Sequence, residues 1–172
     1  MKSKPLALSL EVNENGEMQE TGATGMKRSR CREIMTSNVR TASPANTLRE
    51  VAEMMRDGDM GSVPVVSDDR LVGIVTDRDI VVRSIAEGNG PDSPVSNALT
   101  TEIFSVGPDD FVFEAVRLMG EKQVRRIPVV NEDGSLAGII SMADVALEME
   151  DEREIAETLE EISSGAAFWS KK

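Results

Sequence analysis

Residues 62–80 read SVPVVSDDRLVGIVTDRDI, and residues 126–145 read RIPVVNEDGSLAGIISMADV. The two stretches follow one pattern, in which a Pro-Val-Val run precedes a glycine, two aliphatic residues, a Thr or Ser, and an aspartate three positions later. The correspondence extends upstream, because Pro44 and Pro108 are 64 positions apart, as the two Pro-Val-Val runs are. Internal repetition of this kind indicates one structural unit of about sixty residues that is present twice.

Hydrophobic spacing predicts the same order of elements in each unit. The order is a short strand, a helix, two strands and a second helix (β-α-β-β-α), which makes the fold a mixed α/β (α+β) one. In the first unit the predicted ranges are 39–41 for the first strand, a helix that begins at Thr47, 63–66 and 71–75 for the next strands, and 77–87 for the second helix. A single unit buries little surface, so we expect the two to pack face to face about a pseudo-twofold axis, with clefts along the seam.

Four parts are expected along the chain. They are a mobile polar leader at 1–29, the first repeat at 30–90, the second repeat at 91–149, and an acidic amphipathic helix with a tail at 150–172. The last part places Ile155, Leu159 and Ile162 at helical spacing among many carboxylates. The single tryptophan, Trp169, follows. We expect it to dock on this chain, on a twin subunit or on a partner.

Composition argues against several classes of function. The chain has 172 residues, of which 40% are hydrophobic and 29% are charged, and its net charge is −12. Proteins that bind duplex nucleic acid present many Lys and Arg side chains to phosphates, which an acidic chain does not. No apolar run approaches the roughly 18 residues that span a bilayer. We therefore expect a cytoplasmic protein that binds neither nucleic acid nor membrane.

The chain contains no histidine and only one cysteine, Cys31. It therefore lacks the commonest general base and metal ligand, and it cannot form a multi-cysteine zinc site. Asp109 and Asp110 suit a helix start better than a catalytic pair. We expect neither an enzyme nor a metal site. Cys31 lies among basic residues, which leaves two interpretations: a thiol whose pKa is lowered, or an inert thiol at the domain edge.

The repeated Thr/Ser-x-x-Asp turn is the candidate functional site. In the first copy Thr76 ends a strand and begins a helix, where main-chain N–H groups are expected to lack partners and to attract an anion. Asp79 returns to the same end, where a carboxylate is able to accept both hydroxyls of a ribose. Ser141 and Asp144 repeat this geometry. The same residues also suit a capping box, which serves only the N–H groups of the helix itself, and both interpretations stay open.

The doubled pattern resembles a tandem pair of CBS domains, also called a Bateman module, over about residues 31–149. TDRDIVVRSIAEG at 76–88, with QVRRIPVV at 123–130, resembles more closely the small bacterial stand-alone CBS-pair proteins of the hypoxic response protein type. That type can carry cysteine and histidine metal ligands near its C-terminus. This chain has no cysteine or histidine there, so the resemblance does not imply a metal site.

The resemblance implies a disc-like module that binds AMP, ADP, ATP or S-adenosylmethionine in clefts between the repeats and that commonly stacks into a homodimer. In family members each site joins the Thr/Ser and Asp of one repeat to the first strand and the segment before the proline of the other. On this chain the first site would comprise Thr76, Arg78, Asp79, Ile103, Phe104, Val124, Arg125 and Arg126, and the second would comprise Ser141, Asp144, Val39, Arg40, Met60 and Gly61.

The two implied sites differ in charge. The first gathers Arg78, Arg125 and Arg126, enough cations for two or more phosphates, so we expect a phosphorylated nucleotide there. The second has at most Arg40, and we expect it to be empty, weaker or suited to a less charged ligand. The alternative is that Arg125 and Arg126 pair with Glu121 or with aspartates on the rim, at little energetic gain.

The sequence thus predicts a regulatory module that binds an adenine nucleotide, senses the energy or stress state of the cell and modulates a protein partner. The alternative is a ligand-free stress or interaction scaffold that acts through its surface and its C-terminal helix.

Overall fold

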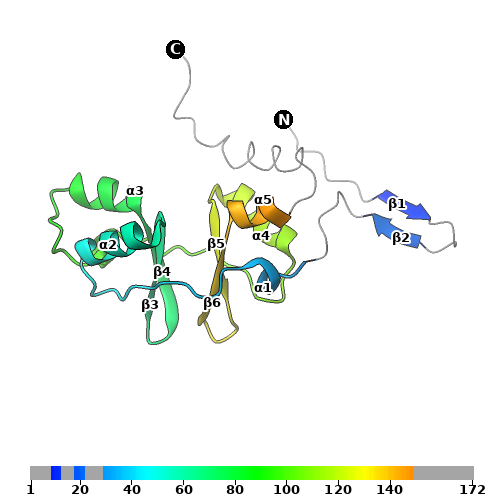
Figure 1. Cartoon of the computed structure of the whole chain (residues 1–172), viewed down its shortest axis with the longest axis horizontal. Coiled ribbons are helices and arrows are strands. Elements are labelled where there is room, and N and C mark those ends of the chain that lie inside the picture. The colour runs from blue at the N-terminus through cyan, green and yellow to red at the C-terminus, as the bar shows by residue number, and fades with distance from the viewer. Residues whose placement is uncertain (1–8, 13–17, 22–28, 149–172) are drawn as a thin grey trace, which may run out of the picture.

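A computed structural model describes residues 9–12, 18–21 and 29–148 of the chain. The predicted C-terminal helix and Trp169 lie outside these residues. Within the predicted leader, β1 (Ser9–Val12) and β2 (Met18–Thr21) pair as an antiparallel hairpin. The rest of the described chain forms two similar halves (Figure 1).

The first half is built on one antiparallel hairpin, β3 (Ser62–Ser67) with β4 (Arg70–Thr76). Helix α2 (Leu48–Gly58) begins where the sequence predicts, because the Thr47 side chain accepts a hydrogen bond from the Glu50 N–H in a capping box. After β4 the chain turns into α3 (Asp77–Asp79), which continues as a π-helix, η1 (Ile80–Ile85). The predicted second helix is therefore present, but its later part has a wider turn.

The second half repeats this order. A short 3-10 helix, η2 (Val95–Asn97), precedes α4 (Val112–Lys122), the hairpin of β5 (Arg126–Val130) with β6 (Leu136–Ser141), and α5 (Met142–Glu148). Both hairpins change register at the same point, after the first Val of the Pro-Val-Val run. The predicted duplication and the α+β class are confirmed.

The predicted first strand at 39–41 does not form. In its place Ala42 makes a single parallel bridge with Val65, and the equivalent Val106 makes one with Val129. The Ala42 N–H donates to the Pro64 oxygen, and the Val66 N–H donates to the Ala42 oxygen. The next bond toward residue 40 would need an N–H from Pro64, which proline lacks, so the ladder stops.

The segment that precedes each repeat packs onto the other repeat. We call residues 31–36 and 95–100 the connecting segments. The first contains α1 (Cys31–Ile34), whose Cys31 is buried with α4, β5, β6 and α5 in the core of the second half. The second contributes Val95 and Ala98 to the core of the first half. The two halves thus complete each other's cores.

The two hairpins stand side by side at the centre, with helices on the outer sides (Figure 1). Their turns meet at one end, where Arg70 bridges to Ser135. The opposite end holds Thr76 and Ser141, the last residues of β4 and β6, so both candidate motifs lie at the same edge of the molecule. Among the described residues, no helix has the length and apolar character that crossing a bilayer requires.

Candidate functional site

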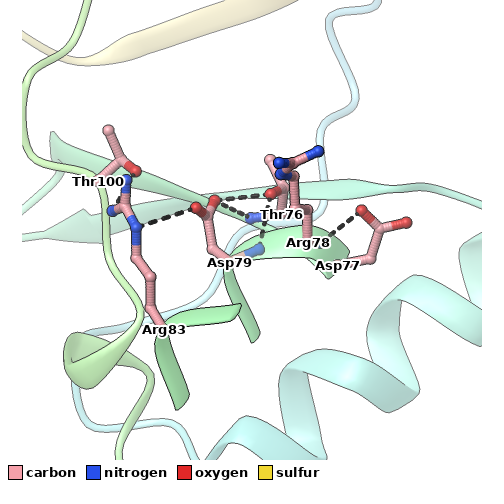
Figure 2. A network of polar contacts seen from close by, with 6 residues as sticks. All are labelled: Thr76, Asp77, Arg78, Asp79, Arg83 and Thr100. Atoms are coloured by element: carbon pink, nitrogen blue, oxygen red, sulfur yellow. Dashed lines mark hydrogen bonds and ion pairs between the residues drawn. The ribbon is translucent and has the colours of Figure 1, made fainter. Parts of the chain in front are cut away.

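The first motif forms a capping box. Asp79 Oδ2 accepts hydrogen bonds from the Thr76 N–H at 3.0 Å and from the Thr76 hydroxyl at 2.6 Å. In return, the Asp79 N–H donates to Thr76 Oγ1 at 3.1 Å. One carboxylate oxygen of Asp79 is therefore committed to the main chain of its own helix (Figure 2), and the capping interpretation is correct for this oxygen.

The N–H groups at this helix start have partners. The Asp77 N–H donates to the Gly61 oxygen at 3.2 Å, and the Arg78 N–H donates to Asp77 Oδ1 at 2.7 Å. With the Asp79 N–H bonded to Thr76, all three N–H groups of α3 are occupied. The prediction of an unpaired N–H anion site is therefore wrong, because the neighbouring strand and the side chains of the turn satisfy these donors. An anion at this turn would need donors other than these three N–H groups, such as arginine side chains.

The second oxygen of Asp79 faces a residue that sequence reasoning missed. Asp79 Oδ1 lies 3.4 Å from Arg83 Nε, and Arg83 Nη1 donates to the Thr100 hydroxyl at 2.9 Å. Figure 2 shows this chain of contacts, which runs from the turn after β4 to the second connecting segment. We call it the Arg83 bridge. The spacing of Asp79 and Arg83 on one helix face was a usable signal, whereas nothing local pointed to Thr100.

The bridge is only partly covered by protein. The Asp79 side chain is 15% exposed, whereas that of Arg83 is 48% exposed. The carboxylate is thus largely enclosed, and its guanidinium partner is free to move toward solvent. An ion pair with one well-exposed member contributes little to stability, so a ligand could displace it at low cost.

The second motif has the same box without the bridge. Asp144 Oδ2 accepts from the Ser141 N–H at 2.7 Å and from the Ser141 hydroxyl at 2.6 Å. The Met142 N–H donates to the Arg125 oxygen at 3.0 Å, as the Asp77 N–H does to Gly61. The residue equivalent to Arg83 is Glu148, which has the wrong charge to pair with Asp144.

Each motif lies against the connecting segment of the other repeat. Thr100 exchanges two main-chain hydrogen bonds with Ile74 of β4, at 2.9 and 3.0 Å. From there the chain runs toward Ile103 and Phe104, where the Phe104 ring packs on the second core and carries Lys122 Nζ 4.5 Å above it. Thr36 pairs in the same way with Ile139 and leads into Val39 and Arg40.

The resemblance implied that the residues before each proline join the motif of the other repeat, but their main-chain hydrogen bonds join the motif of their own repeat. Gly61 bonds to Asp77, and Arg125 bonds to Met142. Met60 precedes Gly61, and Val124 bonds to the end of α4. Arg126 reaches across the interface, because its Nη2 lies 3.9 Å from the point that a Cβ on Gly61 would occupy.

The expected arginines are not used in ion pairs within the part of the chain that the structure describes. None of the guanidinium groups of Arg78, Arg125 and Arg126 has a carboxylate oxygen within 4.0 Å there. Glu121, the suggested rim partner, lies 3.8 Å from Arg117 instead. The rim-pair interpretation is therefore wrong for Glu121, and no carboxylate of the described residues pairs with these three cations.

A groove of about 520 Å³ lies elsewhere, on the outer side of the first half. It runs between α2 and η1 and is lined by apolar side chains such as Leu48, Ala52 and Ile85, with Arg49 and Arg56 among its polar residues. None of the predicted site residues lines it.

Cys31 is not a reactive thiol. It is fully buried, and burial raises its pKa to about 11, with the charges of Asp110 and Glu114 acting in the same direction. The basic neighbours in sequence therefore do not lower it. Among the described residues, no group of three or more histidine, cysteine, aspartate or glutamate side chains could hold a metal ion.

Known proteins share both the pattern and the fold. The CBS domain family matches residues 31–85 and 95–151. The CBS domain-containing protein YhcV of Bacillus subtilis is 38% identical over 116 residues, which are 67% of this chain and 82% of that protein. Hypoxic response protein 1 of Mycobacterium tuberculosis is 38% identical over 117 residues, which are 67% of this chain and 81% of that protein.

Solved structures agree. A crystal structure of Hypoxic Response Protein I with two coordinated zinc ions superposes with a TM-score of 0.64 at 36% identity, over 69% of this chain and 98% of that one. The CBS domain pair of protein MJ0100, in complex with 5'-methylthioadenosine and S-adenosyl-L-methionine, gives a TM-score of 0.64 at 20% identity, over 70% of this chain and 95% of that one.

Proposed function

The chain belongs to the CBS domain family, and on that premise we propose that it is a regulatory module whose Thr76–Asp79 turn binds an adenosine ligand that carries phosphate. One observation carries the proposal. A largely enclosed carboxylate, Asp79, faces the connecting segment of the other repeat, and the guanidinium groups of Arg78 and Arg126 flank the same turn without ion pairs among the described residues. Carboxylates accept ribose hydroxyls, and arginines bind phosphates in charge-assisted hydrogen bonds.

The fold supports this ligand class. The CBS domain pair of MJ0100, which has the same fold, is in complex with 5'-methylthioadenosine and S-adenosyl-L-methionine, and this supports an adenosine ligand. In our proposal the first site takes AMP, ADP or ATP, because its arginines complement phosphates. The second site, with Ser141 and Asp144 but fewer cations, is suited to a ligand with less negative charge. The protein acts by binding and not by catalysis.

The capping box limits how a sugar can bind. Asp79 Oδ2 already accepts two hydrogen bonds from Thr76, so a ribose would be held mainly through Oδ1. Replacing the carboxylate by an amide keeps one oxygen for the cap and removes the charged oxygen that the sugar would use. Asp79→Asn therefore separates ligand binding from capping.

Titration calorimetry of the full chain with AMP, ADP, ATP and S-adenosylmethionine tests the proposal. We expect wild-type binding, loss of the tighter event in Asp79→Asn, and its retention in the matched variant Asp144→Asn. Both variants should melt close to the wild type. If the wild type bound none of the four ligands, or if Asp79→Asn bound them all unchanged, the proposal would be wrong.

We also propose that the outer helices form a homodimer interface. Large apolar side chains are exposed there, namely Val81 at 56%, Val82 at 52% and Ile85 at 61% on η1, with Phe113 at 51% on α4 and Leu147 at 89% on α5. Contiguous apolar patches on a protein surface, such as the three neighbouring residues of η1, often mark sites of protein–protein contact. Dimerisation would bring four Thr/Ser-x-x-Asp turns into one assembly, from which a bound state is passed to a protein partner.

The second candidate function is a ligand-free interaction scaffold. The exposed apolar residues on the outer helices favour it as much as they favour a dimer. It predicts no binding of any adenosine ligand, so the calorimetric experiment separates the two.

A further inference from the structure

The two halves of this chain hold the same capping box but differ in what contacts its free oxygen. In the first half Arg83 Nε lies 3.4 Å from Asp79 Oδ1, and the same guanidinium bonds to Thr100. In the second half the equivalent position holds Glu148, which is not a cation, and Asp144 has no ion pair among the described residues. The second motif is thus an internal comparison, identical in its cap and lacking the Arg83 bridge.

The Arg83 bridge occupies the oxygen that a sugar would need. Asp79 Oδ2 is saturated by the Thr76 N–H and hydroxyl, which leaves Oδ1 for any ligand hydroxyl. A hydroxyl that bonds to Oδ1 has to compete with the guanidinium of Arg83. An uncharged nucleoside offers the displaced cation nothing in return, whereas a phosphate on the same ligand gives it a new anionic partner.

The turn that carries Arg83 differs in structure from its counterpart in the second half. Arg83 lies in η1, a π-helical turn, whereas residues 145–148, which correspond to the first part of η1, lie in the α-helix α5. The hydroxyl of the next residue, Ser84, is buried and has no hydrogen-bond partner among the described residues. Short π-helical turns and unsatisfied buried hydroxyls are both unusual, and both are found at functional sites.

We propose that Arg83 determines the specificity of the first site by competing with the sugar for Asp79, so that this site selects adenosine ligands with phosphate over the plain nucleoside. This inference rests on the proposed function, because it concerns the regulation of the same site. It predicts that the second site, which has no such competitor, discriminates much less between nucleoside and nucleotide.

The experiment compares adenosine with AMP by amide NMR on the full-length protein. Shifts at Thr76 and Asp79 report on the first site, and shifts at Ser141 and Asp144 report on the second. The variant Arg83→Met removes the guanidinium and keeps an apolar side chain of similar length. Arg117→Met is the matched control, because Arg117 also pairs with a carboxylate one helical turn away, at 3.8 Å, but lies on α4.

In the wild type and in Arg117→Met we expect AMP to bind the first site at least about tenfold more tightly than adenosine does. In Arg83→Met we expect adenosine to bind several-fold more tightly than in the wild type, so that the ratio of the two Kd values falls to about threefold or less. Shifts of the second site should not change. Arg83→Lys, which keeps the charge, should restore part of the preference for AMP.

Two outcomes overturn the inference while the proposed function stands. One is an unchanged Kd ratio in Arg83→Met, and the other is weaker adenosine binding in that variant, which would make Arg83 a sugar contact and not a competitor. Absence of AMP and adenosine binding to wild type and variant alike overturns the specificity role, and the proposed function falls with it if ADP, ATP and S-adenosylmethionine also fail to bind. A dispersed spectrum of each variant shows that the fold is kept.

Discussion

The main-chain oxygen of Thr100 lies 2.8 Å from the point that a Cβ on Gly73 would occupy. The oxygen of Thr36 stands at the same distance from the equivalent point on Gly138. The glycine of each repeated motif is therefore needed for close approach, because the connecting segment of the other repeat lies directly on the strand. In this way the connecting segment of each repeat packs against the other half, three residues before Thr76 in one case and three residues before Ser141 in the other.

Gly73→Ala is expected to lower the free energy of unfolding by about 1 to 3 kcal/mol, because the new methyl group overlaps a main-chain oxygen that cannot rotate away. Urea denaturation followed by circular dichroism measures this change. Gly90→Ala is the matched control, since nothing lies within 4 Å of its Cβ position, and its effect should stay within about 0.5 kcal/mol or be stabilising. Equal stability of the two variants would contradict the close-contact role of Gly73.

Thr47→Ala is expected to destabilise the protein by about 1 kcal/mol, because Thr47 accepts the Glu50 N–H at the start of α2 and Ala cannot. Thermal unfolding of Thr47→Ala beside Thr41→Ala provides the comparison, as Thr41 is exposed and precedes the helix without capping it. A melting temperature for Thr47→Ala that matched that of Thr41→Ala would show that the box adds nothing to stability.

Stability should fall at alkaline pH through Cys31. Burial raises the pKa of this thiol to about 11, above the value of about 8.5 in an unfolded chain. The unfolded state therefore loses the thiol proton at a lower pH than the folded state does. The stability that the protonated thiol contributes is complete below about pH 8.5 and is lost as the pH rises toward 11, by at most roughly 1.4 kcal/mol per pH unit. Urea unfolding from pH 8 to 11 measures it, with Cys31→Ala as the reference. Parallel pH profiles for the two proteins would rule out the effect.

Ile85→Glu is expected to convert the proposed dimer into a monomer, because it places a charge on the exposed apolar surface of η1. Sedimentation equilibrium gives the mass of each form. Ser96→Glu adds the same charge at an exposed position on η2 and should leave the mass unchanged. A monomeric wild type, or a dimeric Ile85→Glu, would remove η1 from the interface.

Much of the fold could be predicted from the chain because the decisive signals are local. The spacing of Leu48, Val51 and Met55 and the Thr47 cap indicate a helix that is observed from Leu48 to Gly58. The predicted first strand of each repeat is reduced to a single bridge, Ala42 with Val65 and Val106 with Val129. Each strand depended on a distant partner, in which a proline has no N–H to offer.

The candidate site was predictable only in part. Thr76 and Asp79, like Ser141 and Asp144, are three residues apart and meet through their own turns, so sequence spacing identifies them. Thr100 could not be found in this way, because it reaches Arg83 only after the second connecting segment has crossed to the first half.

The amino-acid sequence alone determined that the chain is a duplicated α+β module with a capped aspartate at the end of each hairpin, because periodicity and i to i+3 contacts act within a few residues. Tertiary structure decided which half each connecting segment joins, that Cys31 is buried in the second core, and that Arg83 stands between Asp79 and Thr100. Those outcomes depend on burying apolar surface between segments that are far apart along the chain. The local spacing of residues does not identify which distant segments pack together.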